Sequence, residues 1–63
     1  MRAWFSKLRE SKGFSQKKLA AMVGISQPSL ANIESGKTNP RITTAKRIAA
    51  VLDFDWTKFF EKS

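Results

Sequence analysis

The apolar residues of this chain recur every three or four positions and nowhere alternate as they would in a strand, so the pattern predicts helices throughout. In the first segment Phe5 and Leu8 share one side, and Gly13 follows as a left-handed stop. Glycine and capping residues break the pattern at short intervals. They divide the chain into five predicted helices, at about residues 2–12, 16–23, 27–35, 42–52 and 56–61.

The predicted helices are joined by very short connections, several with a clear start or stop signal. Ser15 and Ser26 are good N-cap residues for the second and third helices, and Gly24 permits the positive φ of a tight turn between them. Pro28 fits the first turn of the third helix, where its missing N–H has no partner to lose. Helices joined so closely pack as a bundle. We therefore expect an all-α fold, a compact five-helix bundle in which residues 1–63 form a single domain.

The charge balance suggests a partner for this bundle. Twelve Lys and Arg residues stand against five Asp and Glu, a formal net charge of +7, which favours a polyanion such as nucleic acid or an anionic membrane surface. The short, glycine-terminated helices disfavour the membrane, because a surface-binding helix needs one long apolar face. The longest apolar runs are only a few residues, too short for a signal peptide or a transmembrane helix.

The residue types that most catalysis and metal binding require are missing. The chain has no histidine and no cysteine, so it lacks the commonest general base, the commonest metal ligand and a thiol nucleophile. It has no glycine-rich phosphate loop either. We therefore expect no enzymatic activity, no metal and no cofactor. The absence of cysteine also favours a reducing compartment, the cytoplasm.

The second and third predicted helices have the composition of a helix-turn-helix unit, whose second helix enters the DNA major groove. Ala20 is small enough for the two helices to approach closely, and Ile25, Leu30 and Ile33 can pin the second one to the core. The segment FSQKKLAAMVGISQPSLANIESGKTNPRITTAKRIAAVL and the tail DFDWTKFF resemble the lambda-repressor and Cro-like family of phage and bacterial regulators. The resemblance extends over roughly residues 3–60.

The resemblance implies that the helix at 27–35 reads bases in the major groove. Its N-terminal half projects neutral hydrogen-bonding side chains, and amides suit base edges because one amide can bond adenine N6 and N7 together. Pro28 cannot donate, so it either touches a thymine methyl group or serves only to start the helix. In the alternative, Gln27 and Asn32 are ordinary solvated polar residues. The expected base-reading residues are Gln27, Pro28, Ser29 and Asn32.

Other residues are expected to bind the DNA backbone, which positions a protein without reading sequence. Gln16 begins the second helix, where backbone N–H groups favour an anion, and the resemblance implies that it clamps a phosphate. Arg41 opposes the dipole of the helix that it precedes, and an external phosphate would explain it; the alternative is a solvated arginine. The expected phosphate-binding residues are Gln16, Lys17, Lys37, Thr38, Asn39 and Arg41.

Two further groups of residues are expected to serve the fold and its assembly. The resemblance implies an ion pair between Arg9 and Glu34 that joins the first and third helices. The tail holds more aromatic rings than one short helix can bury. The surplus is a candidate homodimer patch made of Val51, Phe54, Trp56 and Phe59. In the alternative, Trp56 only packs over the edge of the core.

We therefore expect a sequence-specific regulator of transcription that binds double-stranded DNA in the bacterial cytoplasm or nucleoid. It is expected to be a repressor of a phage, plasmid or other mobile-element promoter and to act as a homodimer on an inverted-repeat operator. The dimer either exists alone or forms only on DNA. The alternative function is that of an antitoxin or anti-regulator, whose main task is to bind a protein partner through the exposed aromatic residues.

Overall fold

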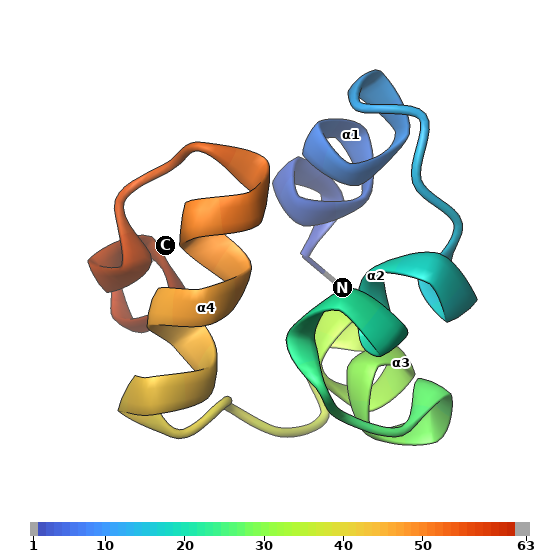
Figure 1. The fold of residues 1–63 in the computed structure, drawn as a ribbon. Coiled ribbons are helices and arrows are strands. Elements are labelled where there is room, and N and C mark those ends of the chain that lie inside the picture. The colour runs from blue at the N-terminus through green and yellow to red at the C-terminus, as the bar shows by residue number, and fades with distance from the viewer. Residues whose placement is uncertain (1, 62–63) are drawn as a thin grey trace.

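The computed structural model describes residues 2–61, which form four α-helices and one 3-10 helix (Figure 1). No strand occurs among these residues, so the predicted all-α class and compact bundle are confirmed. The α-helices are α1 (Ala3–Ser11), α2 (Gln16–Val23), α3 (Gln27–Ser35) and α4 (Ile42–Leu52), and the 3-10 helix is η1 (Trp56–Phe60).

The fifth predicted helix is wrong in type, because residues 56–60 form a 3-10 helix rather than an α-helix. The segment is five residues long, and 3-10 geometry is common in helical pieces this short. Asp55 caps it, since its carboxylate accepts the Thr57 backbone N–H at 3.0 Å. At the other end of the chain α1 is one residue shorter on each side than predicted, because Arg2 and Lys12 are its capping residues.

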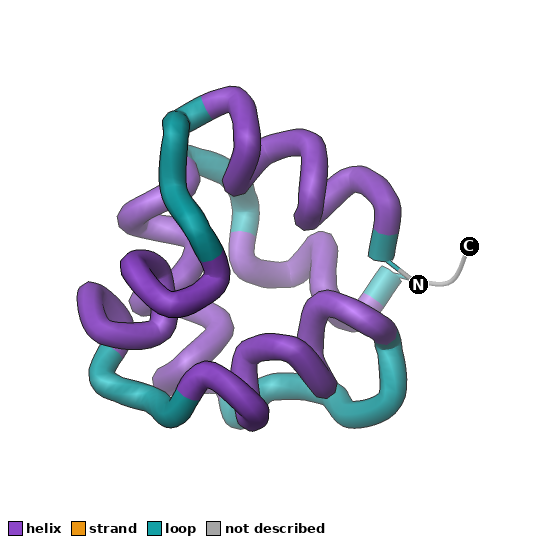
Figure 2. Tube along the Cα trace, turned by 90° about the vertical axis from the view of Figure 1, so that its right-hand side faces the viewer, coloured by secondary structure: helices purple, strands orange, loops and turns teal. Residues whose placement is uncertain are grey.

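The core draws side chains from every α-helix. The largest fully buried side chains are Phe5 of α1, Leu19 of α2, Leu30 of α3, and Ile48 and Leu52 of α4. Helix α3 packs against α1 and α2, and α4 packs against α2 and η1. Helices make up most of the tube in Figure 2, and the short loops lie at the corners between them. Such short loops leave α2 and α3 little freedom to move relative to one another.

The predicted caps and the turn between α2 and α3 are confirmed. The Ser15 hydroxyl accepts the Lys18 N–H at 3.0 Å, and the Ser26 hydroxyl accepts the Ser29 N–H at 3.2 Å. Gly24 has φ +83°, a left-handed conformation that costs glycine nothing and any other residue strain. Local signals of this kind therefore set where α2 ends and where α3 begins.

The aromatic residues divide into a buried group and a surface pair. Trp4 and Phe54 meet the ring of Phe59 edge-on, with centroid distances of 5.4 and 5.5 Å, and Phe59 is only 4% exposed. Trp56 and Phe60 form a separate pair 6.1 Å apart, and Phe60 is 44% exposed. The rings around the buried Phe59 join η1 to α1, whereas in the second pair Trp56 is half-buried and Phe60 is exposed.

Candidate nucleic-acid interface

The turn between α2 and α3 fixes the direction of α3. The backbone N–H groups of Gly24 and Ile25 both donate to the Ala20 carbonyl, at 2.9 and 3.0 Å. Ala20 is 3% exposed, which is possible because its small side chain lets the two helices approach closely. The side chains of Leu30 and Ile33 are only 0% and 5% exposed, so they hold the inner face of α3 against the core. The exposed residues of α3 lie outside this packed face.

The first turn of α3 presents polar and apolar groups to solvent. Gln27, Pro28 and Ser29 are all exposed. The Gln27 side chain makes no hydrogen bond to another residue in the range 2–61, so its amide is available to a ligand. The Ser29 hydroxyl accepts a hydrogen bond from the Ser26 hydroxyl at 2.8 Å and keeps its own proton for donation. Three of the four expected base-reading residues therefore share one accessible surface.

A groove of about 310 Å³ connects α3 to the loop that follows it. Asn32, the fourth expected base-reading residue, is half-buried there, which leaves less of its amide free than in the exposed first turn. Expected base-reading and phosphate-binding residues therefore border the same groove. Those that line it are Ser29, Asn32, Thr38, Asn39 and Arg41.

The loop between α3 and α4 exposes its polar side chains and is anchored by a buried proline. Lys37, Thr38, Asn39 and Arg41 are exposed, whereas Pro40 is buried. Arg41 is the N-cap residue of α4 but makes no side-chain capping bond. The first backbone N–H groups of α4 are therefore open to an anion, beside a permanent positive charge.

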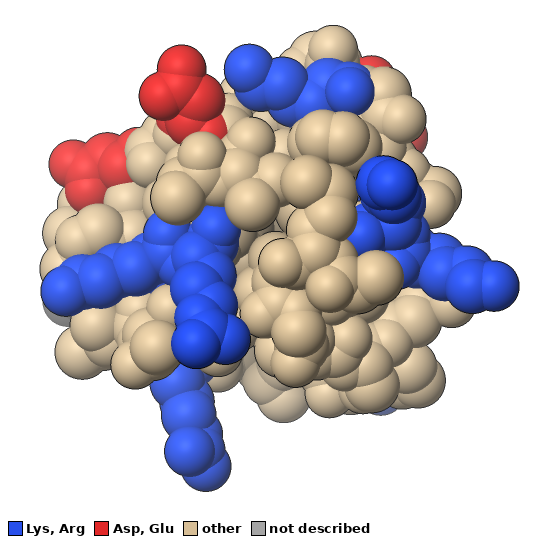
Figure 3. Space-filling model, in the orientation of Figure 1, with Lys and Arg blue, Asp and Glu red and all other residues tan. Residues whose placement is uncertain are grey.

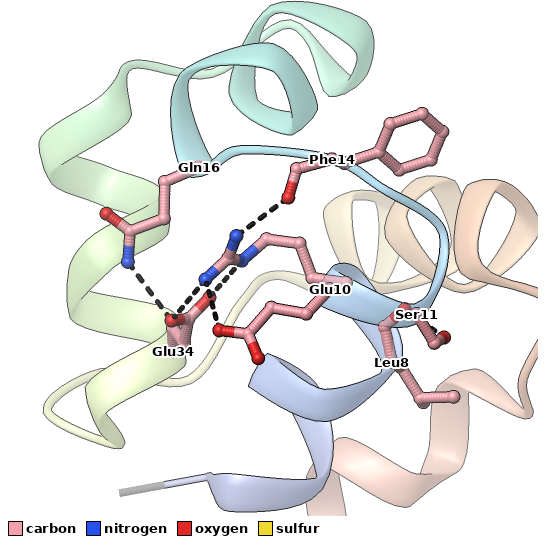
Figure 4. Close-up of polar contacts among 7 residues, drawn as sticks. Leu8, Glu10, Ser11, Phe14, Gln16 and Glu34 are labelled. Carbon is pink, nitrogen blue, oxygen red and sulfur yellow. Dashed lines mark hydrogen bonds and ion pairs between the residues drawn. The ribbon is translucent and has the colours of Figure 1, made fainter.

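A buried carboxylate ties the start of α2 to α1 and α3. Glu34 is 4% exposed and accepts hydrogen bonds from Arg9 Nε at 2.8 Å, Arg9 Nη2 at 3.2 Å and Gln16 Nε2 at 3.1 Å. Arg9 Nη1 also donates to the Phe14 carbonyl at 2.7 Å. In Figure 4 the Gln16 amide nitrogen points toward Glu34 and its oxygen points away. The Gln16 side chain thus keeps one N–H that it can donate to a phosphate oxygen.

The surroundings of Glu34 keep this carboxyl ionised. Burial alone raises the pKa of Glu34, but hydrogen bonds and the positive charge of Arg9 outweigh burial and leave the pKa below its ordinary value. The Ser6 hydroxyl is buried beside this carboxyl without a hydrogen bond of ordinary geometry, so we assign the lowering to Arg9 and Gln16. The same hydrogen bond raises the pKa of Arg9. Both partners are therefore charged near neutral pH.

Basic side chains surround the site but are absent from α3 itself, whose sequence contains no Lys or Arg. Lys17 is exposed beside Gln16 at the start of α2. On the face drawn in Figure 3, basic side chains project over the half occupied by α4 and from the opposite edge, and acidic ones lie toward the top. The basic side chains are thus carried by elements other than α3, and the exposed first turn of α3 carries neutral groups.

The expected dimer patch loses one of its members. Val51, Phe54 and Trp56 are half-buried. Phe59 is 4% exposed, so its ring lies in the core and not at a surface, which corrects the prediction. Phe60, which was not among the expected site residues, is the exposed ring beside Trp56. Consecutive residues point in different directions around a helix, so when Phe59 faces the core Phe60 faces away from it.

Arg2 was not among the expected site residues either, yet it contacts the loop. Its Nη1 donates to the Thr38 carbonyl at 3.2 Å, and its Nη2 donates to the Asn39 side-chain oxygen. Burial lowers the pKa of Arg2. The partners lie 36 and 37 residues away in sequence, so no local pattern signals these contacts.

Neither a metal centre nor a membrane-spanning segment appears in the part of the chain that the structure describes. Residues 2–61 hold no group of three or more Asp, Glu, His or Cys side chains placed to bind a metal ion. None of the helices in this range has the length and the apolar character needed to cross a membrane.

Comparisons with known proteins agree with this geometry. A family model described as helix-turn-helix matches residues 5–59. The uncharacterized HTH-type transcriptional regulator YqaF of Bacillus subtilis is 41% identical over 61 residues, which are 97% of this chain and 80% of that protein. The HTH-type transcriptional regulator PuuR of Escherichia coli is 28% identical over 57 residues, which are 90% of this chain but only 31% of PuuR.

A solved structure agrees with these sequence comparisons. The N-terminal DNA-binding domain of SinR from Bacillus subtilis superposes with a TM-score of 0.79 at 28% sequence identity. The match covers 95% of this chain and 88% of the SinR domain. The relatives are thus transcriptional regulators by name, and the similar structure is a DNA-binding domain.

Proposed function

The chain belongs to the helix-turn-helix family, in the Cro-like branch that its motifs resemble, and on that premise we propose that it is a sequence-specific regulator of transcription. In this proposal α3 enters the major groove of double-stranded DNA. One observation carries it: the first turn of α3 exposes the Gln27 amide, which makes no hydrogen bond to another residue in the range 2–61, while Leu30 and Ile33 of the same helix are buried. Members of this family are normally not enzymes.

Base reading is assigned to Gln27, Pro28, Ser29 and Asn32. The free amide of Gln27 can bond adenine N6 and N7 at once, a contact worth about 1–3 kcal/mol of discrimination against other bases. Ser29 can donate its hydroxyl proton to a base acceptor, and Pro28 can touch a thymine methyl group. Asn32 reads from the groove between α3 and the following loop, where it is half-buried.

Binding to the DNA backbone is assigned to the two ends of the same surface. At one end, Gln16 and Lys17 bind phosphates from the start of α2. At the other end, the loop 37–41 and the open N-terminus of α4 bind them. The loop residues in this role are Lys37, Thr38, Asn39 and Arg41. A dimer that neutralises about ten phosphates would lose affinity with a log–log salt slope near −9.

We further propose that two copies bind an inverted repeat and repress by covering a promoter of a phage, plasmid or other mobile element. The pairing surface is the patch of Val51, Phe54, Trp56 and Phe60. The exposure of the Phe60 ring, at 44%, supports this surface, because large exposed aromatic groups favour a protein contact. Two-fold pairing would set two copies of α3 one DNA turn apart, ~34 Å.

The exposed ring of Phe60, beside the half-buried Trp56, also supports the second candidate function. In an antitoxin or anti-regulator, Trp56 and Phe60 would contact a different protein, and DNA binding would be secondary. Sedimentation analysis of the purified chain separates the two. A dimer, alone or with DNA, supports the homodimer, and a monomer under both conditions supports the protein partner.

The test of the main proposal is a selection from a random duplex library at near-physiological salt. We expect an inverted repeat to be retained, with a half-site spacing that reports the dimer. Gln27→Ala should lose the preference at one base position per half-site. The matched control Gln16→Ala should weaken binding to every duplex and leave all base preferences intact, because phosphate contacts read no sequence. Retention without any base preference would refute the proposal.

A further inference from the structure

Arg2 joins two parts of the molecule that are more than thirty residues away in sequence. Its backbone N–H donates to the Glu34 carbonyl at 2.9 Å. Its Nη1 donates to the carbonyls of Ile33 and Thr38, the latter at 3.2 Å, and its Nη2 donates to the Asn39 side-chain oxygen. One residue outside α1 thus holds both the last turn of α3 and the loop that follows α3.

The guanidinium group is itself held in place by the core. It lies over the Phe59 ring, with 5.5 Å between its central carbon and the ring centroid, and Phe59 is buried. Arg2 is half-buried there. A guanidinium carries five N–H donors in a rigid plane, so it can serve several acceptors at fixed angles. A lysine ammonium is a single point charge and lacks that plane.

The loop depends on this contact more than α3 does. Helix α3 is also held by the buried Leu30 and by the ion pair between Glu34 and Arg9. Within residues 2–61, the hydrogen bonds of Arg2 are the side-chain contacts that hold Thr38 and Asn39. Loss of Arg2 should therefore loosen the loop and leave α3 in position.

We infer that Arg2 is a positioning residue for DNA binding, which orders the loop 37–41 before DNA arrives. The inference deepens the proposed function and rests on it, because the loop is there assigned to the phosphates. Ordering a loop in advance removes an entropic cost that binding would otherwise include. Because phosphate contacts carry no sequence information, Arg2 should affect overall affinity and not base preference.

The test compares Arg2→Gln and Arg2→Lys with the charge-matched control Lys7→Gln, a change at an exposed position of α1. Two duplexes serve as probes: the one recovered by selection, and a mixed-sequence duplex of equal length. We expect both Arg2 variants to bind both duplexes about 5- to 10-fold more weakly, with an unchanged ratio between the two duplexes. Lys7→Gln should change either affinity by less than about twofold.

A second measurement follows the loop directly, in the protein without DNA. The Lys37 and Thr38 amides donate to the Asn32 carbonyl at 3.0 and 3.3 Å, so their hydrogen exchange reports loop order. Both Arg2 variants should speed this exchange, while the melting temperature falls only slightly.

Two results would overturn the inference. They are full recovery of affinity in Arg2→Lys and unchanged amide exchange in the loop. A loss confined to the selected duplex would also overturn it, since Arg2 would then act on base reading. Failure of the proposed function appears differently, as a wild-type chain that binds neither duplex or binds both equally well.

Discussion

The buried Glu34 carboxylate offers the sharpest test of how this fold is held together. The change is Glu34→Gln, which keeps the shape of the side chain and removes its charge. Arg9 is then left with 12% of its side chain exposed and no charged partner inside the core. Removing one member of a buried pair costs about 3–5 kcal/mol when both are fully desolvated. Because Arg9 keeps its bond to the Phe14 carbonyl and is not fully desolvated, we expect a cost just below that range, about 2–3 kcal/mol.

That loss is large for a chain of 63 residues. A domain of this size has a free energy of unfolding of about 3–9 kcal/mol. One kcal/mol shifts the melting temperature of so small a domain by roughly 4–8 °C, so Glu34→Gln should lower it by about 10–20 °C. The assay is thermal unfolding followed by circular dichroism.

Glu10→Gln is the matched control, because Glu10 also lies near Arg9. Its carboxylate is 3.9 Å from Arg9 Nη2, but 68% of its side chain is exposed. An exposed pair contributes about 0–1 kcal/mol, so this control should melt within about 8 °C of the wild type. If Glu34→Gln melts no lower than Glu10→Gln, the burial argument is wrong.

The pH dependence gives the same prediction an independent check. The folded pKa of Glu34 lies below its unfolded value, so its stabilisation is fully present above the unfolded pKa of about 4.3 and is lost as pH falls through the folded pKa. The melting temperatures of wild type and Glu34→Gln should therefore differ at pH 7 and converge in acid. A gap that stays constant down to pH 2 would contradict the assignment.

Three further changes test other parts of the structure. Gly24→Ala should lower stability by about 1–2 kcal/mol, because the added Cβ has room but the φ of +83° strains alanine; an unchanged melting curve would contradict this. Asp53→Asn should raise stability by about 0.5 kcal/mol, since Asp53 has φ +61° at the C-terminus of α4, where asparagine fits as well without the unfavourable charge. Phe60→Ser should weaken self-association in sedimentation and leave the melting temperature within a few degrees, because Phe60 is exposed; an unaffected dimer would exclude Phe60 from the pairing surface.

The parts of the fold that local sequence sets could be predicted. Ser15, Ser26 and Gly24 act within a few residues of themselves, so the bounds of α2 and α3 follow from propensity and capping alone. The resemblance supplied the pairing of Arg9 with Glu34, which lie 25 residues apart. The bases and phosphates assigned to individual side chains stay predictions, because a chain without DNA does not test them.

The parts that depend on distant contacts could not be predicted. Arg2 meets Thr38 and Asn39 only after the whole bundle has closed, and no periodicity marks such a pair. At the other end, consecutive residues of a short helix point in different directions, so the pattern predicts that only one of Phe59 and Phe60 faces the core and does not say which. Phe59 is buried and Phe60 is exposed, and that choice depends on how η1 packs against α4 and α1.

The division of α3 into a buried face and an unpartnered face has a practical consequence for protein engineering. Gln27 and Pro28 contribute no side-chain hydrogen bond to the rest of the described chain, whereas Leu30 and Ile33 carry the attachment of α3 to the core. The residues that would choose a DNA target can therefore be randomised as a library without first rescuing the scaffold. New target preferences should then be reachable in few steps, each evaluated on a protein that still folds.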